Sequence, residues 1–213
     1  EVPVISGKDS MYNQATVYDK DGNKIERGVF PMLFMTTFAK IDDISKIVTV
    51  DVKQEGDLVY VVGSKTKADM GGSEYNNMIS EKTGIEFNVG NVSSENLKEV
   101  FETYQKMNEA QTSGLLQSAQ YIGDGGLALA LKDAAMSGMK GVNADFSRLH
   151  QEAGLTHDEL MYSVTEGRVL VTVKPENKAS FERMFSNKVS QIGVVTGKNN
   201  LTFSDGSKNL LEM

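Results

Sequence analysis

The sequence predicts an α+β domain in which helices cover a mixed, largely antiparallel sheet. Short apolar runs rich in β-branched and aromatic residues alternate with segments whose apolar residues recur at helical spacing. No internal repeat, low-complexity tract or shift of composition marks a second hydrophobic core. At 213 residues, the chain is long enough to bury a sizeable core without disulfides or metal ions.

Extended segments make up much of the predicted core. The polar interval 11–29 precedes them and is predicted as a surface loop or hairpin, because Asp21-Gly22 is a hairpin-turn dipeptide. The segment 58–64 has the strongest strand pattern, an apolar run closed by glycine. The predicted strands are 30–41, 46–52, 58–64, 115–122, 140–146, 167–175 and a final pair, 191–197 with 200–203.

The helix predicted at 93–114 has the clearest amphipathic pattern. Ser93 or Ser94 is expected to cap it, and acidic residues fill its first turn. Thr156, with Glu159 three residues later, predicts a capping box for a shorter helix. The apolar stripe of 93–114 consists of Leu97, Val100, Phe101, Tyr104 and Met107. The predicted helices are 73–81, 93–114, 127–138, 156–164 and 176–187.

Composition excludes several classes of function. The 22 basic and 29 acidic residues give a net charge of −7 and a pI near 5.0, which opposes a broad nucleic-acid or anionic-membrane surface. Cysteine is absent, which rules out disulfides and thiolate metal sites and fits a reducing compartment. No apolar run approaches the ~20 residues of a membrane span, and residues 1–13 lack a signal-peptide pattern. A soluble, cytoplasmic protein is expected.

Isolated polar residues give only weak signals of chemistry. Neither His150 nor His157 has a sequence neighbour spaced for a catalytic triad or a zinc site, so both are predicted to have ordinary structural or surface roles. Asp42-Asp43 resembles an acidic metal-binding pair but lacks a third ligand nearby, which favours a solvated turn. Six methionines are predicted to fill the core: Met32, Met35, Met78, Met107, Met136 and Met139.

Three glycine-containing segments are more informative. In the segment 123–126, GDGG, glycines let the backbone approach a ligand, and the following helix start offers N–H groups to a phosphate. Asp124 there is expected either to hold magnesium or to cap the helix. The segment 71–75, GGSEY, repeats this loop-to-helix arrangement. The segment 6–10, SGKDS, offers lysine for phosphate, aspartate for metal and serine for an oxyanion, although it is not a Walker A loop.

The order of these motifs resembles a known family. PVISGKDSMYN, GDLVYVVG, GGSEY, DGGLALAL, GRVLVTVKPE and IGVVTG follow one another as in the phosphoribosylformylglycinamidine synthases, members of the aminoimidazole ribonucleotide synthetase superfamily. The resemblance covers nearly the whole chain and is weakest at 80–95 and at both ends. It implies that residues 1–29 comprise the tail of a preceding N-terminal-type domain and a surface loop. It also implies that residues 30–213 are the second C-terminal-type domain. The preceding domain would then belong to a longer polypeptide.

This resemblance implies an ATP- and glutamine-dependent ligase of purine biosynthesis, with ATP and Mg²⁺ as cofactors. ATP would phosphorylate the amide oxygen of formylglycinamide ribonucleotide, and ammonia from a glutaminase domain or subunit would displace the phosphate. The implied partners are this glutaminase and the remaining domains of the synthase. The residues carried over for nucleotide or substrate phosphate are Gly7, Lys8, Ser10, Gly125 and Gly126, those for metal are Asp9 and Asp124, and Ser73, Glu74 and Arg168 also match family motifs.

The sequence also departs from the family pattern. Where the family has His-Asp-x-Ser before Asp-Gly-Gly, this chain has Gln120, Tyr121 and Gly123, so a magnesium-binding carboxylate is lost. A family glutamate becomes Val164, although Glu166 survives nearby. We therefore expect a weakened nucleotide site and an isolated chain without activity. The alternatives are a non-catalytic paralogue, another single-repeat ATP-dependent member such as a selenophosphate synthetase or hydrogenase-maturation protein, or a pure interaction module.

Overall fold

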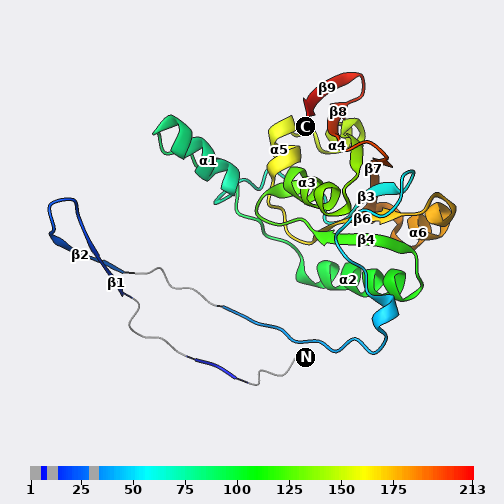
Figure 1. Ribbon diagram of the computed structural model, residues 1–213, viewed down its shortest axis with the longest axis horizontal. Coiled ribbons are helices and arrows are strands. Elements are labelled where there is room, and N and C mark those ends of the chain that lie inside the picture. Colours follow the sequence, from blue (N-terminus) through cyan, green and yellow to red (C-terminus); the bar gives the residue numbers. More distant parts are fainter. Residues whose placement is uncertain (1–5, 9–13, 29–33) are drawn as a thin grey trace. The chain divides into compact units, whose positions relative to one another are not determined.

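The computed structural model describes residues 6–8, 14–28 and 34–213, which fall into two units, Glu1–Ile41 and Asp42–Met213. The described part of the first unit includes an antiparallel hairpin, β1 (Gln14–Tyr18) with β2 (Lys24–Gly28) (Figure 1). The Asp19 carboxylate accepts hydrogen bonds from the backbone N–H groups of Asp21 and Asn23. Gly22 takes a positive φ of 82° in the turn. The hairpin predicted around Asp21-Gly22 is therefore confirmed.

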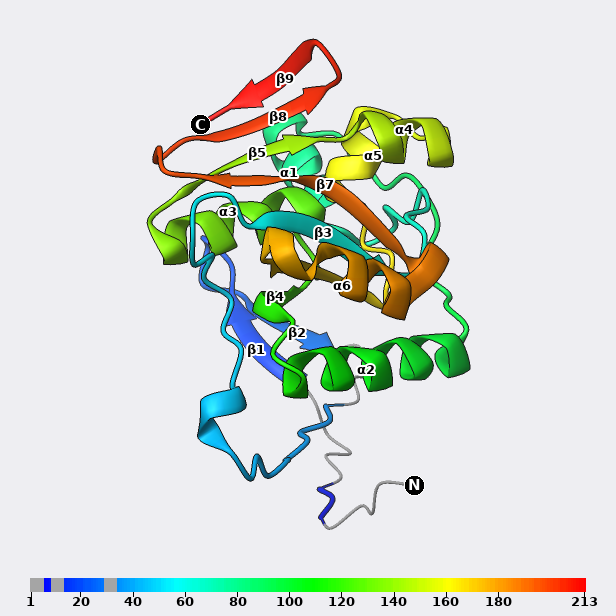
Figure 2. The same cartoon turned by 90° about the vertical axis from the view of Figure 1, so that its right-hand side faces the viewer.

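The second unit is built on a seven-stranded sheet in the order β4-β6-β3-β7-β5-β8-β9 (Figure 2). All neighbouring strands run antiparallel except β5 and β8, which are parallel. The mixed, largely antiparallel α+β fold is thus confirmed. The strands are β3 (Leu58–Gly63), β4 (Leu116–Tyr121), β5 (Gly141–Asp145), β6 (Arg168–Val173), β7 (Val189–Thr196), β8 (Leu201–Asp205) and β9 (Lys208–Glu212).

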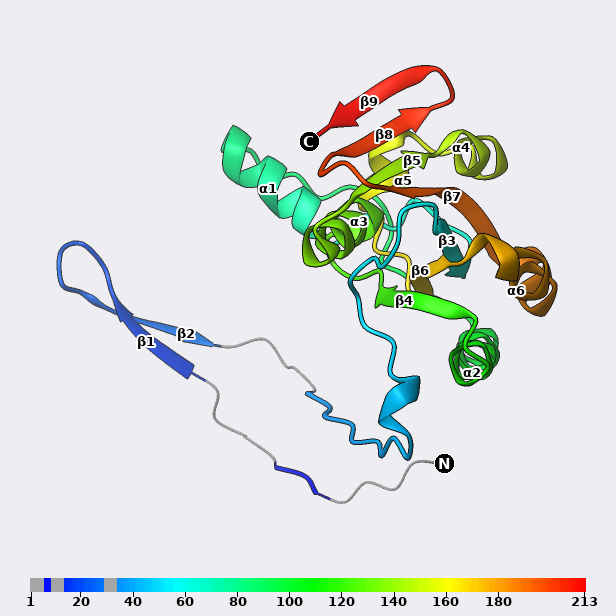
Figure 3. The ribbon, with the colours of Figure 1, turned by 45° about the vertical axis from the view of Figure 1, so that its right-hand side comes forward.

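Helices cover both faces of this sheet, as Figure 3 shows for α3 on one side and for α2 and α6 on the other. Side chains of β3 alternate between the two cores: Val59 and Val61 pack with α3, whereas Tyr60 and Val62 pack with α6. A strand buried on both faces reads as one continuous apolar run. The helices are α1 (Glu74–Thr83), α2 (Leu97–Thr112), α3 (Gly126–Gly138), α4 (Ser147–Ala153), α5 (His157–Tyr162) and α6 (Lys178–Phe185), with 3₁₀ turns at Ile44–Lys46, Pro175–Asn177 and Ser186–Lys188.

Two predicted strands are wrong. Residues 34–41 form no strand, and their side chains are exposed, while 30–33 lie outside the described residues. The segment 46–52 makes two isolated backbone hydrogen bonds instead of the regular series of a paired strand. The Thr49 carbonyl accepts from the Ala119 N–H, and the Val52 N–H donates to the Ala134 carbonyl. Their β-branched content was compatible with a strand, but no neighbouring strand pairs with them along their length.

The final strand pair is also wrong in its pairing. Strands β7 and β8 both form, but β5 lies between them and bonds to each. The sequence analysis also missed the short helix α4 and the last strand, β9. Strand order within a sheet depends on contacts between distant segments, which local patterns do not encode.

Only part of the apolar stripe of α2 faces a core, through Met107. Leu97 is 82% exposed and Phe101 61% exposed, and Asn96 caps the helix in place of Ser93 or Ser94. The methionine prediction fails similarly, because Met107 packs against a core whereas four others are exposed and Met32 lies outside the described residues. The exposed methionines are Met35, Met78, Met136 and Met139. None of the described helices is long and apolar enough to cross a membrane.

Candidate functional site

One end of the sheet gathers several loops, among them those that carry the DGG motif and Arg168. Because β3 and β4 both run antiparallel to β6, the ends of β3 and β4 lie beside the beginning of β6, with Gly63 opposite Arg168 and Tyr121 opposite Val169. We call this the loop edge, comprising residues 63–69, 121–126, 163–168 and 188–190. Four segments distant in sequence thereby lie at one end of the sheet.

The guanidinium of Arg168 organises the interior of the loop edge. It is fully buried and donates to the Thr165 carbonyl at 2.8 Å, the Ser163 carbonyl at 2.6 Å and the Thr66 hydroxyl at 3.1 Å. Burial lowers the pKa of Arg168 to about 10, so the group stays charged at neutral pH. This arginine therefore holds the loops together and does not face solvent.

A second buried network joins the same loops. The Thr165 hydroxyl donates to Asp69 Oδ2 at 2.7 Å and accepts from the Lys67 backbone N–H at 3.0 Å. The Val164 backbone N–H donates to the Asp69 carbonyl at 2.8 Å. Sequence reasoning missed Asp69 and Thr165, since neither has a motif partner nearby along the chain. Their roles depend on a contact across 96 positions.

Tyr121 stands where the resemblance described above implies an aspartate. Its hydroxyl donates to Glu166 Oε2 at 2.7 Å, and the Glu166 backbone N–H donates to the Ser93 hydroxyl at 2.9 Å. Partial burial and this hydrogen bond raise the pKa of Tyr121 well above its usual range. The phenol therefore stays neutral and occupies one oxygen of the neighbouring carboxylate.

The DGG segment begins α3, as predicted, but its residues differ in role. Gly125 is the N-cap of α3, and no side chain forms a capping hydrogen bond there. The alternative that Asp124 caps this helix is therefore wrong. The Asp124 side chain is exposed. Gly126 has a φ of 67°, and a Cβ atom there would lie 2.5 Å from the Met161 carbonyl oxygen. Close packing of α3 on α5 therefore accounts for Gly126 without any ligand.

The GGSEY segment begins α1, which projects from the sheet in Figure 1. Ser73 is buried and caps the helix by accepting from the Asn76 backbone N–H at 3.3 Å, while Glu74 is exposed. Asn76 in turn donates to the Met70 and Val89 carbonyls. These contacts give Ser73 a role in local folding and leave Glu74 at the surface.

A cavity of about 310 Å³ opens beside the loop edge. Three lysines lie around it: Lys65 and Lys67 from the loop after β3, and Lys188 before β7. Lys67 pairs with Glu95, and Lys188 Nζ lies 3.5 Å from Glu99 Oε2. Ammonium groups and the hydroxyls of Ser64, Thr66 and Ser190 suit the binding of an anion such as phosphate. The Glu152 carboxylate, which pairs with Arg148, also lines the cavity.

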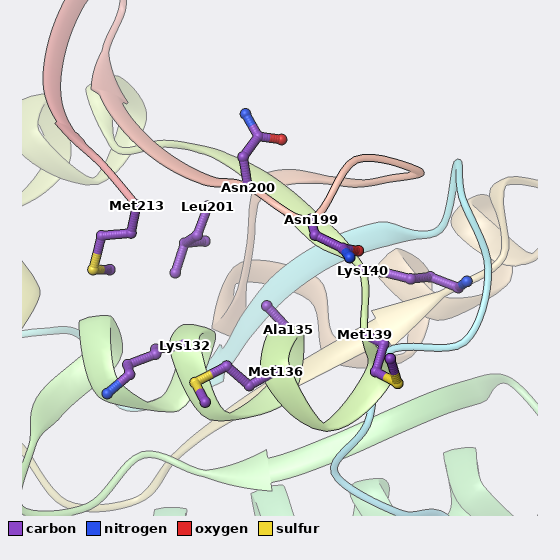
Figure 4. A pocket seen from close by; sticks show the side chains of 9 residues that line it. All are labelled: Lys132, Ala135, Met136, Met139, Lys140, Asn199, Asn200, Leu201 and Met213. Atoms are coloured by element: carbon purple, nitrogen blue, oxygen red, sulfur yellow. The ribbon is translucent and has the colours of Figure 1, made fainter.

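A second cavity, of about 340 Å³, lies beside the C-terminal half of α3. Figure 4 shows it between that helix, the segment 199–201 and Met213. Three methionines line it, Met136, Met139 and Met213. No motif of the sequence analysis lies there, and its lining is chiefly apolar.

The remaining predicted residues lie elsewhere. Gly7 and Lys8 are exposed in the first unit, while Asp9 and Ser10 lie outside the described residues. Asp43 accepts from the Ser45 backbone N–H at 2.9 Å and caps a 3₁₀ turn, which confirms the predicted turn.

The two histidines, which are predicted to have ordinary structural or surface roles, share one hydrogen-bond partner. Both contact Asp205, which lies 55 and 48 positions away along the chain. The fold brings these three side chains together, and sequence spacing alone gives no sign of it.

Comparison with known proteins places the fold in a family. The family of AIR synthase related proteins, C-terminal domain, matches residues 54–206. The subunit PurL of phosphoribosylformylglycinamidine synthase from Lactobacillus helveticus is 34% identical over 202 residues, which is 95% of this chain and 24% of that protein. The chain thus spans about a quarter of the length of this relative.

Solved structures share the fold at low sequence identity. PurL of Thermotoga maritima in complex with FGAR superposes with a TM-score of 0.69 at 15% identity, covering 80% of this chain and 29% of that one. The hydrogenase maturation protein HypE in complex with ATP gives a TM-score of 0.53 at 13% identity, covering 80% and 54%. The family match spans the sheet from β3 to β8. The chain therefore belongs to the AIR synthase related proteins, of which it carries the C-terminal domain.

Proposed function

We propose that this chain is the second C-terminal-type domain of a phosphoribosylformylglycinamidine synthase, an ATP- and glutamine-dependent ligase of purine biosynthesis. The observation that carries this proposal is the 34% identity to a PurL subunit across 95% of the chain. In this assignment residues 1–29 comprise the tail of the preceding N-terminal-type domain and a surface loop, and 30–213 form the C-terminal-type domain.

The domain is proposed to bind phosphate groups and to contribute little to the chemical step. The lysine-lined cavity at the loop edge supports phosphate binding, and two phosphorylated compounds, ATP and the ribonucleotide, are substrates of the proposed enzyme. In the second unit Gly125 is proposed to contact phosphate, and Gly7, Lys8 and Ser10 of the first unit are proposed as phosphate contacts in their own right. Ser73 and Arg168 hold their own loops in place through the contacts described above, and Glu74 is proposed as an exposed residue at the start of α1.

The available carboxylates fit a strong magnesium site poorly. Mg²⁺ is usually held by one or two carboxylates, substrate phosphates and several waters. Asp124 is exposed, but Tyr121 supplies no charge and occupies an oxygen of Glu166. When bound, Mg²⁺ would neutralise phosphate charge. We propose Asp124 as a candidate ligand in the second unit and Asp9 as a separate candidate in the first, and we propose that nucleotide binding by this domain is weak.

The exposed face of α2 supports an association with the rest of the synthase. Leu97, Phe101 and Tyr104 are all exposed and lie within two turns of one helix. A contiguous apolar surface of this kind is typical of contacts with another protein or domain. We propose that another domain of the synthase, to which a glutaminase subunit or domain delivers ammonia, covers it.

Activity of the isolated chain and of the longer protein tests this proposal. With ATP, glutamine and formylglycinamide ribonucleotide, the longer polypeptide is expected to form ADP and glutamate, whereas the 213-residue chain is expected to form neither. Turnover by the chain alone would contradict the proposal. If the gene encodes only one small domain upstream of Glu1, that result would instead support the single-repeat alternative. The similarity of the fold to HypE is the observation that favours this alternative.

A further inference from the structure

The only two histidines of the chain meet at a single carboxylate. His150 Nδ1 and His157 Nε2 each lie 2.8 Å from Asp205 Oδ2, and the two imidazole rings are 4.9 Å apart. All three prospective ligand atoms lie within 4.8 Å of one another. This cluster lies outside the loop edge and is not used by the proposed function.

Three separate backbone elements hold these side chains in place. His150 lies in α4, whose left-handed C-cap is Gly154, and His157 is the first residue of α5. The Thr156–Glu159 capping box fixes that first turn. Asp205 ends β8, which β5 pairs in parallel. The arrangement therefore depends on the folded backbone more than on flexible side chains.

The donor set suits a transition metal. Two imidazole nitrogens and one carboxylate oxygen are typical ligands of Zn²⁺, with water in the fourth position, whereas Mg²⁺ prefers oxygen alone. The side chains remain 38%, 26% and 21% exposed, so an ion can enter from solvent. Asp145, whose carboxylate accepts from the Gly206 N–H at 3.0 Å, adds negative charge beside Asp205.

We propose that His150, His157 and Asp205 form a binding site for Zn²⁺ or a transition-metal ion of similar ligand preference. Bound there, the ion replaces the two imidazole–carboxylate hydrogen bonds with metal–ligand bonds. It thereby links α4 and α5 to the turn between β8 and β9. The three ligands lie on none of the segments that form the loop edge, and water fills the fourth position of the ion.

Zn²⁺ alone, titrated onto the complete 213-residue chain, tests this proposal. Because the chain has two histidines, an NMR spectrum of the imidazole rings reports on this site and no other histidine. Both ring signals are expected to shift together and to saturate at one ion per chain. A large excess of Mg²⁺ is expected not to reverse the shift. Zinc binding that leaves both rings unchanged would overturn the proposal.

Variants separate this site from exposed carboxylates. His157→Gln is expected to lower the Zn²⁺ affinity at least about tenfold. Even the loss of a residue that only hydrogen-bonds to a metal ligand typically has an effect of that size. Asp133→Asn, which removes an exposed carboxylate on α3, serves as the control and is expected to keep the parent affinity. Asp205→Asn replaces His157→Gln if circular dichroism shows that the latter is unfolded. Parent-like affinity in a folded variant of either ligand would exclude the site.

Discussion

Arg168 shows how a family motif can serve folding instead of ligand binding. Its side chain bonds to two carbonyls and one hydroxyl within the loop edge, and it has no exposed surface. A buried guanidinium is stable only when its surroundings supply such acceptors. The consequence is that its loss should reduce stability before it affects any ligand.

Arg168→Met is expected to lower the free energy of unfolding by at least about 2 kcal/mol, since the substitution leaves the Ser163 and Thr165 carbonyls buried without donors. Urea denaturation followed by circular dichroism measures this change. Arg183→Met on the exposed side of α6 is the matched control, with an expected change within about 0.5 kcal/mol. Equal stability of the two variants would show that the Arg168 bonds contribute little.

Tyr121 allows a test of the weakened nucleotide site. Tyr121→Asp supplies the carboxylate that the family pattern has at this position and frees the Glu166 oxygen. Magnesium-dependent ATP binding is expected to tighten by about tenfold, or roughly 1.4 kcal/mol. Isothermal titration calorimetry with and without Mg²⁺ measures it.

Tyr121→Phe is the control for this change, because it removes the hydroxyl without adding charge and is expected to leave ATP affinity low. Micromolar, magnesium-dependent ATP affinity in the parent chain, lost on Asp124→Ala, would contradict the weakened-site proposal.

At the level of elements, local patterns predicted most helices and strands correctly. Continuous apolar runs marked β3 and β6 because both are buried on two faces. The Thr156–Glu159 capping box marked the start of α5 because its bonds are local. The stripe on α2 misled because amphipathic spacing identifies an apolar face without showing what covers it.

The candidate site was less predictable for the same reason. DGG and GGSEY were correctly placed at helix starts, since glycine and cap preferences act over a few residues. Contacts such as Thr165 with Asp69, or both histidines with Asp205, join segments 48 to 96 positions apart. No periodic pattern in the intervening sequence indicates that these residues contact one another in the folded chain.

The junction of α3 and α5 provides a stability test at this scale. Gly126→Ala is expected to cost about 2–4 kcal/mol, because the added Cβ combines a left-handed φ with a 2.5 Å approach to the Met161 oxygen. Gly72→Ala has a similar φ of 72° but open space around the new Cβ, and should cost only about 1 kcal/mol. Thermal unfolding of both variants separates backbone strain from steric overlap; equal losses would show that the helix contact tolerates a methyl group.

For the whole molecule, buried charge affects how stability changes with pH. Most described carboxyl groups with a perturbed pKa, such as Asp43 and Asp145, have a pKa that hydrogen bonds lower. Their contributions to the stability of the fold are therefore lost as the pH falls. Asp57 is the opposite case. Its side chain lies before β3 and is only 2% exposed, and burial raises its pKa.

Asp57→Asn is therefore expected to stabilise the chain at neutral pH, since the amide keeps an acceptor for the Gln54 N–H without burying a charge. The pKa of Asp57 is higher in the folded state than in the unfolded state. Above the folded-state pKa, the buried carboxylate of the parent is charged and lowers the free energy of unfolding. This destabilisation disappears as the pH falls below the pKa of the unfolded state. The stability difference between variant and parent should accordingly be largest at neutral pH and shrink toward acid pH. Urea unfolding across this pH range measures it, and a difference that grows on acidification would show that the carboxylate of Asp57 stabilises the fold.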